Sequence, residues 1–209
     1  PNAVKKGDLV VSVKDYGAVG DGVTDDSVAI QNAINAVAHV FVPSGTYRCD
    51  TMLEIGSNRT LELGGGTFLS RLSAYSSATT PVVWIKGASS SLIGAGQTSS
   101  GVSSQNRAPQ GVVRLGHKDM TESHGNVSYC TLMNMDISGS MSYGQTTGAP
   151  DAALYMANPQ FSGLVSYFHN IFGLRVRNAN YGIWMQGWAN ANTISHIQGY
   201  NLGNTALGV

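Results

Sequence analysis

The sequence predicts an all-β repeat protein, in which short strands wind into a solenoid behind one short helix. Three observations predict this class. A glycine-rich turn and an amphipathic segment lie near the N-terminal end, and two kinds of short apolar strand then alternate along the chain. In addition, only 11% of the 209 residues are charged, while small polar residues are abundant. That composition is typical of a turn-rich β protein with a polar, uncharged surface.

The N-terminal segment contains the predicted helix. Leu9 to Val13 is apolar and β-branched, which favours a strand. The glycines that follow permit tight turns, and Thr24 is the expected helix cap. Asp25 and Asp26 then fall in the first turn, where the helix dipole favours negative charge, so their predicted role is structural. One apolar face at helical spacing consists of Ile30, Ala33, Ile34 and Val37.

After the helix, strands are predicted to the end of the chain. Val40 to Ile55 reads as a strand, a Pro-Ser-Gly turn and a second strand. One recurring kind of strand comprises 82–86, 112–116, 153–157, 182–186 and 206–209. The other kind comprises 91–93, 131–137, 170–176 and 193–198. Ile171 and Ile194 are 23 residues apart, a spacing typical of a solenoid coil, and successive coils would stack at about 4.8 Å.

Corner insertions and the chain end complete the outline. Extra residues are expected in loops at 96–110, 117–129, 138–150 and 158–169, and loops on a rigid scaffold often carry function. The predicted organisation is a cap over 1–55 and coils over 56–209. Because Val209 falls within a strand, an open core would follow it, and we expect a longer natural chain with a further domain upstream.

The N-terminal segment resembles the start of the pectate-lyase-like right-handed β-helix domains of bacteriophage tailspikes and related polysaccharide depolymerases. The matching residues are Asp15-Tyr16-Gly17-Ala18, Gly20-Asp21-Gly22, Thr24-Asp25-Asp26, Ile30-Gln31, Ala33-Ile34 and Val42-Pro43-Ser44-Gly45-Thr46-Tyr47. The match covers about the first quarter of the chain in detail. It implies a right-handed parallel β-helix whose helix closes the first coil.

The same resemblance implies a function. A phage tailspike-type protein binds bacterial surface polysaccharide, either capsule or O-antigen, and cleaves it by glycoside hydrolysis. Alternatives within the fold are a polysaccharide lyase and a non-catalytic receptor-binding or structural appendage. The resemblance further implies a homotrimer, attachment to the phage tail or baseplate through sequence outside this chain, and a virion location facing the host bacterium. No cofactor is expected.

Strand alternation defines a ladder on the outer surface. In the first kind of strand, the pairs Val83/Ile85, Val113/Leu115, Leu154/Met156 and Ile183/Met185 point inward. The residues between them are Trp84, Arg114, Tyr155 and Trp184, stacked one per coil. Aromatic rings and arginine suit a saccharide platform, but they also suit a subunit interface or burial under a loop. Trp188, in a separate turn, is a second platform candidate.

Catalytic candidates are few. Glycoside hydrolysis in most families needs two carboxylates, and we consider Asp119, Glu122, Asp136 and Asp151. The register places Asp136 over Arg175 and then Gln198, which favours a salt bridge rather than an acid pair. A lyase would instead use a basic residue near a uronic acid. The catalytic acids can also lie across a subunit boundary or beyond this chain.

Other site classes are not indicated. Asp119 and Glu122 share a loop with His117 and His124, but that spacing matches no metal template, so a solvated loop is expected. Cys49 and Cys130 are predicted to be free, buried thiols. Balanced charge argues against nucleic-acid binding, and no apolar run is long enough to span a membrane.

Overall fold

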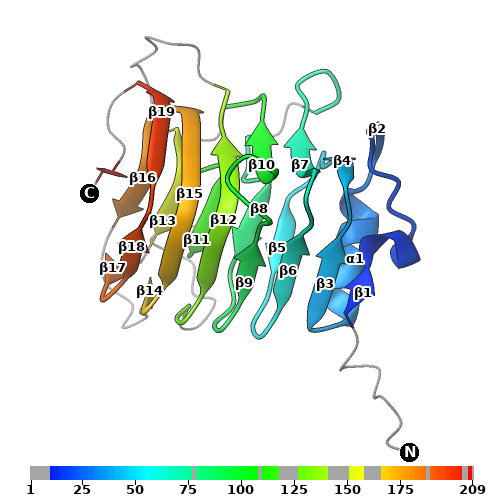
Figure 1. Ribbon diagram of the computed structural model, residues 1–209, viewed down its shortest axis with the longest axis horizontal. Coiled ribbons are helices and arrows are strands. Elements are labelled where there is room, and N and C mark those ends of the chain that lie inside the picture. Colours follow the sequence, from blue (N-terminus) through cyan, green and yellow to red (C-terminus); the bar gives the residue numbers. More distant parts are fainter. Residues whose placement is uncertain are drawn as a thin grey trace, which may run out of the picture.

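The computed structural model is a right-handed parallel β-helix, with its coils stacked in chain order from the cap (Figure 1). It describes residues 10–76, 79–107, 110–117, 127–140, 151–157, 166–186, 189–203 and 207–208. Within these residues the strands form sheets of 12, 6 and 2 strands, and every strand pair is parallel. Each strand pairs with the equivalent strand of a neighbouring coil, as the repeat predicts.

The large sheet contains β1 (Val11–Ser12), β2 (Asp21–Asp25), β3 (His39–Val42), β4 (Gly45–Arg48), β6 (Thr60–Leu63), β7 (Thr67–Arg71), β9 (Ser91–Ile93), β10 (Ser100–Ser104), β12 (Thr131–Ser138), β15 (Asn170–Ala179), β18 (Thr193–Ser195) and β19 (Gln198–Leu202). The six-stranded sheet contains β5 (Leu53–Ile55), β8 (Val83–Ile85), β11 (Val113–Gly116), β13 (Ala152–Ala157), β16 (Tyr181–Gln186) and β20 (Leu207–Gly208). The remaining pair is β14 (Ser166–Tyr167) and β17 (Ala189–Asn190).

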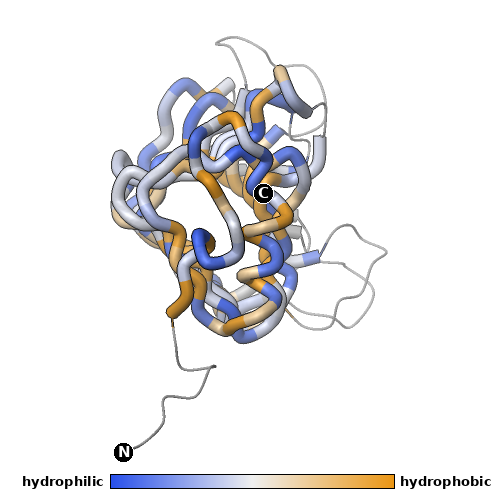
Figure 2. Tube along the Cα trace, turned by 90° about the vertical axis from the view of Figure 1, so that its right-hand side faces the viewer, coloured by the Kyte–Doolittle hydropathy of each residue, from blue (hydrophilic) through white to orange (hydrophobic). Residues whose placement is uncertain are grey.

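The core is a stack of inward-facing aliphatic side chains. Leu61, Leu92, Leu132 and Ile171 occupy one register position on successive coils, and each is 0% exposed. Ile194 continues the row, so the predicted pairing of Ile171 with Ile194 is confirmed. Viewed from the cap end, the coils superimpose around this common interior (Figure 2).

Helix α1 and the first strand differ from the sequence prediction in their boundaries. Helix α1 spans Ser27–Ala36, with Asp26 as its N-cap, so Thr24 does not cap it and neither aspartate lies in its first turn. Thr24 instead lies in strand β2, where its hydroxyl donates to Asp21. The first strand is only Val11–Ser12, because Val13–Tyr16 forms a 3-10 turn, η2, closed by Gly17 at φ 91°.

The predicted structural role of the cap aspartates agrees with their contacts. Asp26 accepts the amides of Val19 and Gly20 at 2.6 and 3.0 Å, and Asp21 accepts those of Val23 and Thr24 at 2.8 and 2.7 Å. The Thr24 and Val23 amides hold the pKa of Asp21 below its ordinary value. These carboxylates therefore fix the turn before α1.

The apolar helix face is confirmed, since Ile30, Ala33, Ile34 and Val37 are all buried. Cys49 and Cys130 are also free and buried, as predicted. The prediction of a loop at 96–110 was wrong, because this segment contains strand β10, which pairs with β7 and β12. No helix among the described residues is both long and apolar enough to cross a membrane.

One corner repeats along the whole solenoid. Two residues before β6, β9, β12, β15 and β18, the chain adopts a positive φ between 55° and 60° at Asn58, Ser89, Tyr129, Phe168 and Ala191. The amides of Asn58, Ser89 and Tyr129 each donate to a carbonyl of the next coil, at 2.9, 2.8 and 3.2 Å. We call these five positions the corner ladder.

Candidate functional site

A second set of bends divides the longest strands into two faces. Asn134 in β12, Gly173 in β15 and His196 between β18 and β19 have φ values of 57°, 65° and 54°. At Gly173 a Cβ atom would lie 2.6 Å from Asn134 Oδ1, so a larger residue there would displace the Asn134 side chain, and glycine adopts the angle without strain. The bend restarts the alternation of side chains and defines the outer surface of the second half of each strand.

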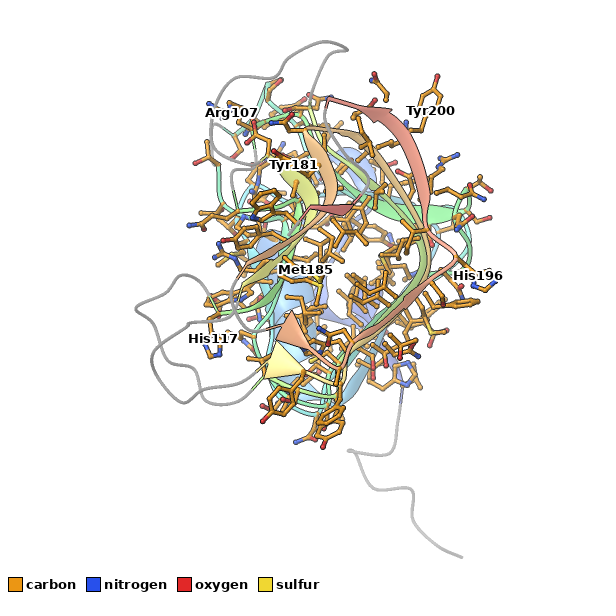
Figure 3. The ribbon with its side chains drawn as sticks, turned by 90° about the vertical axis from the view of Figure 1, so that its left-hand side faces the viewer. Arg107, His117, Tyr181, Met185, His196 and Tyr200 are labelled. Atoms are coloured by element: carbon orange, nitrogen blue, oxygen red, sulfur yellow. The ribbon has the colours of Figure 1, made fainter. Side chains whose placement is uncertain are left out.

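Beyond the bend, two rows of side chains point outward. Leu174 and Val176 are buried, whereas Arg175 and Arg177 between and after them are 29% and 36% exposed. Gln198 pairs with Arg175, and Tyr200 pairs with Arg177. These four side chains and Gly199 line a groove of about 370 Å³, which we call the arginine groove. Tyr200 projects outward from β19 at its rim (Figure 3).

Asp136 anchors both arginines from the adjacent coil. Its carboxylate accepts from Arg175 Nε and, at 2.9 Å, from Arg177 Nε, while its side chain is only 4% exposed. One carboxylate therefore balances one of two guanidinium groups, which leaves a net positive charge at the groove. The planar donor groups of arginine suit carboxylate or sulfate-type anions.

The outward row of the groove continues over earlier coils as serines. Ser70, Ser103 and Ser138 share the register position of Arg177, and Ser70 Oγ lies 2.9 Å from Ser103 Oγ. Ser138 Oγ accepts from Asn178 Nδ2 at 3.0 Å. Ser70 and Ser138 are buried, so this row of hydroxyl groups bonds within the fold rather than extending the groove.

The predicted salt bridge of Asp136 is confirmed, and so is its register over Arg175 and then Gln198. Asp151 stands just before β13, in the other large sheet, and its carboxylate accepts from Arg107 Nε at 2.9 Å. No strand register in the described residues places Asp136 beside Asp151 or any other carboxylate. Among the residues that the structure describes, neither acid has the paired carboxylate that glycoside hydrolysis needs in most families.

Three candidate residues cannot be placed. Asp119, Glu122 and Trp188 lie outside the described residues. His117, at the start of the loop that contains Asp119 and Glu122, is 0% exposed, so the expectation of a solvated position was wrong for this residue. Among the described residues, no group of three or more His, Cys, Asp and Glu side chains could hold a metal ion.

The register of the outer ladder was predicted correctly, because Trp84, Arg114, Tyr155 and Trp184 pair in order on successive coils. However, Trp84, Arg114 and Tyr155 are only 3%, 1% and 8% exposed. The Arg114 guanidinium lies between the two rings, 5.9 Å from that of Trp84 and 5.4 Å from that of Tyr155. These three side chains are therefore buried within the chain, which is one of the alternatives left open for the ladder, whereas Trp184 remains partly exposed.

A smaller cavity of about 260 Å³ lies beside the cap, and its polar groups are already engaged. Gln31 bonds the backbone of Glu54 in both directions, at 2.8 and 3.1 Å. Arg59 donates to the carbonyls of Ile34 and Val37 at 2.7 and 2.6 Å. These contacts join α1 to the first coils, so we assign them to structure.

Sequence reasoning missed Arg177 and Tyr200. The signal was available, since both follow their neighbours Arg175 and Gln198 at a spacing of two in a strand already in register with Asp136. The ladder of Trp84 and Tyr155 lies on the six-stranded sheet instead, where both side chains are buried.

Comparison with known proteins agrees with this fold. The family model described as "Rhamnogalacturonase A/epimerase, pectate lyase-like" matches residues 10–207. A plasmin and fibronectin-binding protein A of Streptococcus pneumoniae is 48% identical over 62 residues, which is 27% of this chain and 9% of that protein. The pre-neck appendage protein of Bacillus phage phi29 is 47% identical over 55 residues, or 26% of this chain and 6% of that protein.

Among solved structures, the Streptococcus pneumoniae surface protein and adhesin PfbA matches with a TM-score of 0.51 and 17% identity. The match covers 94% of this chain and 61% of that chain, and it bears on the fold alone. The aligned sequence segments span less than a tenth of the two relatives, at 9% and 6% of their lengths.

Proposed function

We propose, from the premise that this chain belongs to the rhamnogalacturonase A/epimerase, pectate lyase-like family, that it binds polysaccharide in the arginine groove. In the full proposal it is part of a phage tailspike-type protein, and the ligand is the capsule or O-antigen of a bacterial host. The similarity to the phi29 pre-neck appendage protein supports a place on a virion.

The composition of the groove is the observation that carries the proposal. Arg175 and Arg177 supply directed donors with net positive charge, Gln198 supplies an amide, and Tyr200 supplies an aromatic ring that is 69% exposed. Rings stack on the C–H faces of sugars, and guanidinium groups bind carboxylates. A polysaccharide containing uronic or other acidic sugars fits this set better than a neutral one.

An array of bacterial capsular and O-antigen polysaccharides tests binding. We expect the chain to retain an acidic glycan, and Tyr200→Ala to weaken retention about fivefold to tenfold through loss of stacking. Tyr75→Ala is the matched control, because Tyr75 is 50% exposed in the turn after β7, away from the groove. Absence of binding to every acidic glycan, or equal losses of retention in both variants, would refute polysaccharide binding in the arginine groove.

Cleavage is the second candidate. Glycoside hydrolysis is the proposed route, and elimination is the alternative. In an elimination, arginines that hold a uronate carboxylate would stabilise the charge that develops as a base takes the neighbouring proton and the glycosidic oxygen leaves. Ultraviolet absorbance of an unsaturated product would identify a lyase, whereas new reducing ends without that absorbance would identify a hydrolase. If cleavage is found, single amide substitutions at Asp119, Glu122, Asp136 and Asp151 will test each candidate acid.

Assembly as a homotrimer attached to a phage tail or baseplate is also a proposal. Light scattering of the full-length protein would report its mass in solution, and a trimeric mass is expected. Labelled protein should bind intact host cells and lose that binding when the cells are stripped of capsule or O-antigen. A monomeric mass would remove the trimer without affecting the binding proposal.

A further inference from the structure

Two residues of the corner ladder are unusual for their backbone angle. Tyr129 and Phe168 have φ values of 59° and 60°, and their side chains are 63% and 48% exposed. Bulky side chains rarely adopt this left-handed region, because the Cβ atom then lies too close to the following carbonyl oxygen. An aromatic residue here is strained in its backbone and also leaves apolar surface in water.

The fold itself does not require aromatic residues at these positions. Asn58, Ser89 and Ala191 adopt the same angle at the same place on other coils, and Asn58 and Ser89 make the same hydrogen bond to the next coil as Tyr129 does. Asparagine is the residue, after glycine, that best tolerates this angle. Folding alone would therefore favour asparagine over tyrosine or phenylalanine.

The two rings form an ordered surface. Their centroids are 5.2 Å apart with planes at 11°, and Tyr167 packs edge-on against Phe168 at 5.0 Å. Phe168 on the following coil covers one face of the Tyr129 ring. The opposite face is turned toward the preceding coil, where the ladder residue is the small Ser89 and then Asn58. Tyr129, Ser89 and Asn58 thus form a step, which we call the corner shelf.

We propose that the corner shelf binds the C–H face of a neutral pyranose, with the Tyr129 ring as the stacking surface. A ring with C–H groups on its face complements the negative face of an aromatic side chain. The Ser89 hydroxyl and the Asn58 amide are exposed beside it and can bond to sugar hydroxyls. None of the five ladder positions carries a charged residue, which selects against an anionic sugar.

The aromatic patch by itself is smaller than the interface between two copies of a chain. A stable interface buries about 800 Å² on each partner. The aromatic part of the ladder is limited to two adjacent coils, and the residues on either side are Ser89 and Ala191. Because one coil step is about 4.8 Å, two steps match about the length of one to two sugar units.

The corner shelf is separate from the arginine groove. The ladder lies at the start of β9, β12, β15 and β18, whereas the groove is formed after the bend, in the second half of β15 and in β19 (Figure 1). The two surfaces are therefore at opposite ends of the same strands. Absence of binding at one site would therefore leave the proposal for the other site unaffected.

Titration with cellohexaose, a neutral glucan with equatorial substituents, tests the corner shelf. Wild-type protein should show ring-proton saturation transfer from tyrosine to the glycan, and Tyr129→Asn should weaken binding at least about fivefold. Tyr129→Phe should keep the affinity within about twofold, since it retains the ring. Ala191→Asn, at a ladder position without an aromatic side chain, is the matched control and should bind as wild type does.

The stability readout separates loss of binding from loss of structure. Because asparagine relieves the backbone strain, Tyr129→Asn should melt at the same temperature as wild type or higher. Absence of cellohexaose binding to wild type, or wild-type affinity in Tyr129→Asn, overturns the proposal. A dimer that dissociates in Tyr129→Asn would assign the rings to an interface between chains and would also overturn it.

Discussion

The backbone amide of Cys130 donates a hydrogen bond to Nδ1 of His169 at 3.2 Å, across one step of the solenoid. His169 is 1% exposed, and its own amide donates to Asn192 Oδ1 at 3.0 Å. A ring nitrogen that accepts carries no proton, so this histidine is neutral in the folded chain. His169 therefore joins three consecutive coils at this corner, with its uncharged ring bonded to the preceding coil and its backbone amide to the following one.

Stability should therefore depend on pH. Burial lowers the pKa of His169 to about 4, whereas an unfolded histidine titrates near about 6.5. Between these values the unfolded chain takes up a proton that the folded chain refuses. The contribution of neutral His169 to the free energy of unfolding is therefore complete above about pH 6.5 and is lost progressively toward about pH 4. The loss is up to about 3 kcal/mol. Urea denaturation across this range measures the slope.

His169→Asn is the control for that prediction. An asparagine carbonyl can accept the Cys130 amide but does not titrate, so the slope between about pH 6.5 and about pH 4 should become shallower. If the variant and the wild type lose stability in parallel, another group causes the acid sensitivity.

Removing the carboxylate of Asp136 should destabilise the fold. Its side chain is 4% exposed, and Asp136→Asn would replace two charge-assisted hydrogen bonds while leaving Arg175 and Arg177 close together. We expect a loss of about 2 to 4 kcal/mol in urea denaturation. Arg177→Ala should cost less, because Arg175 still pairs with Asp136. Wild-type stability in Asp136→Asn, combined with loss of glycan cleavage, would instead point to a catalytic acid.

Two glycines in adjacent coils should respond in opposite ways to alanine. At Gly87 a Cβ atom would lie 1.9 Å from the Ser57 nitrogen, which no side-chain movement can relieve. Gly87→Ala should cost about 3 kcal/mol or more, or prevent folding. At Gly56 nothing lies within 4 Å, so Gly56→Ala should be neutral or stabilise by about 0.5 kcal/mol. Thermal melting of the pair measures the difference, and similar values would contradict this packing.

The two thiols should be inert in the folded chain. Burial raises the pKa of Cys130 to about 11 and that of Cys49 further still, so neither forms thiolate near neutral pH. A thiol-specific disulfide reagent should react slowly with native protein and modify both cysteines in guanidinium chloride. Rapid modification of one thiol without denaturant would show that its coil opens locally.

Much of the fold could be predicted because coil stacking constrains the sequence at regular intervals. Val83, Val113, Leu154 and Ile183 are inward at one register position, and each is followed by an outward residue and another inward one. The turn from Ile171 to Ile194 has no insertion, so residue spacing alone predicts that Asp136, Arg175 and Gln198 share one register position.

Strand β10 and the start of α1 could not be predicted for local reasons. β10 reads SGVSS, which lacks the apolar alternation of its neighbours, and it is held by pairing with β7 and β12 rather than by propensity. Asp25 and Asp26 fit a helical first turn, but the Asp26 carboxylate accepts the amides of Val19 and Gly20, and the helix begins only at Ser27.

The candidate site was predicted less well, because alternation states which way a side chain points and not what covers it. Trp84 and Tyr155 point outward as expected and are nevertheless buried. The positive φ at Tyr129 and Phe168 belongs to a corner that repeats from coil to coil, and no local pattern in the sequence reveals it.

The shared register of the coils has a consequence for how such a protein can change. The bend at Gly173 decides which face Arg175 and Arg177 occupy, while the number of preceding coils decides how far along the axis they stand. Duplication of one intact coil upstream would move the groove by one step and leave its chemistry in place. The position of the groove along the axis and the side chains that line it can therefore change independently, so coils can be added in evolution without altering the groove.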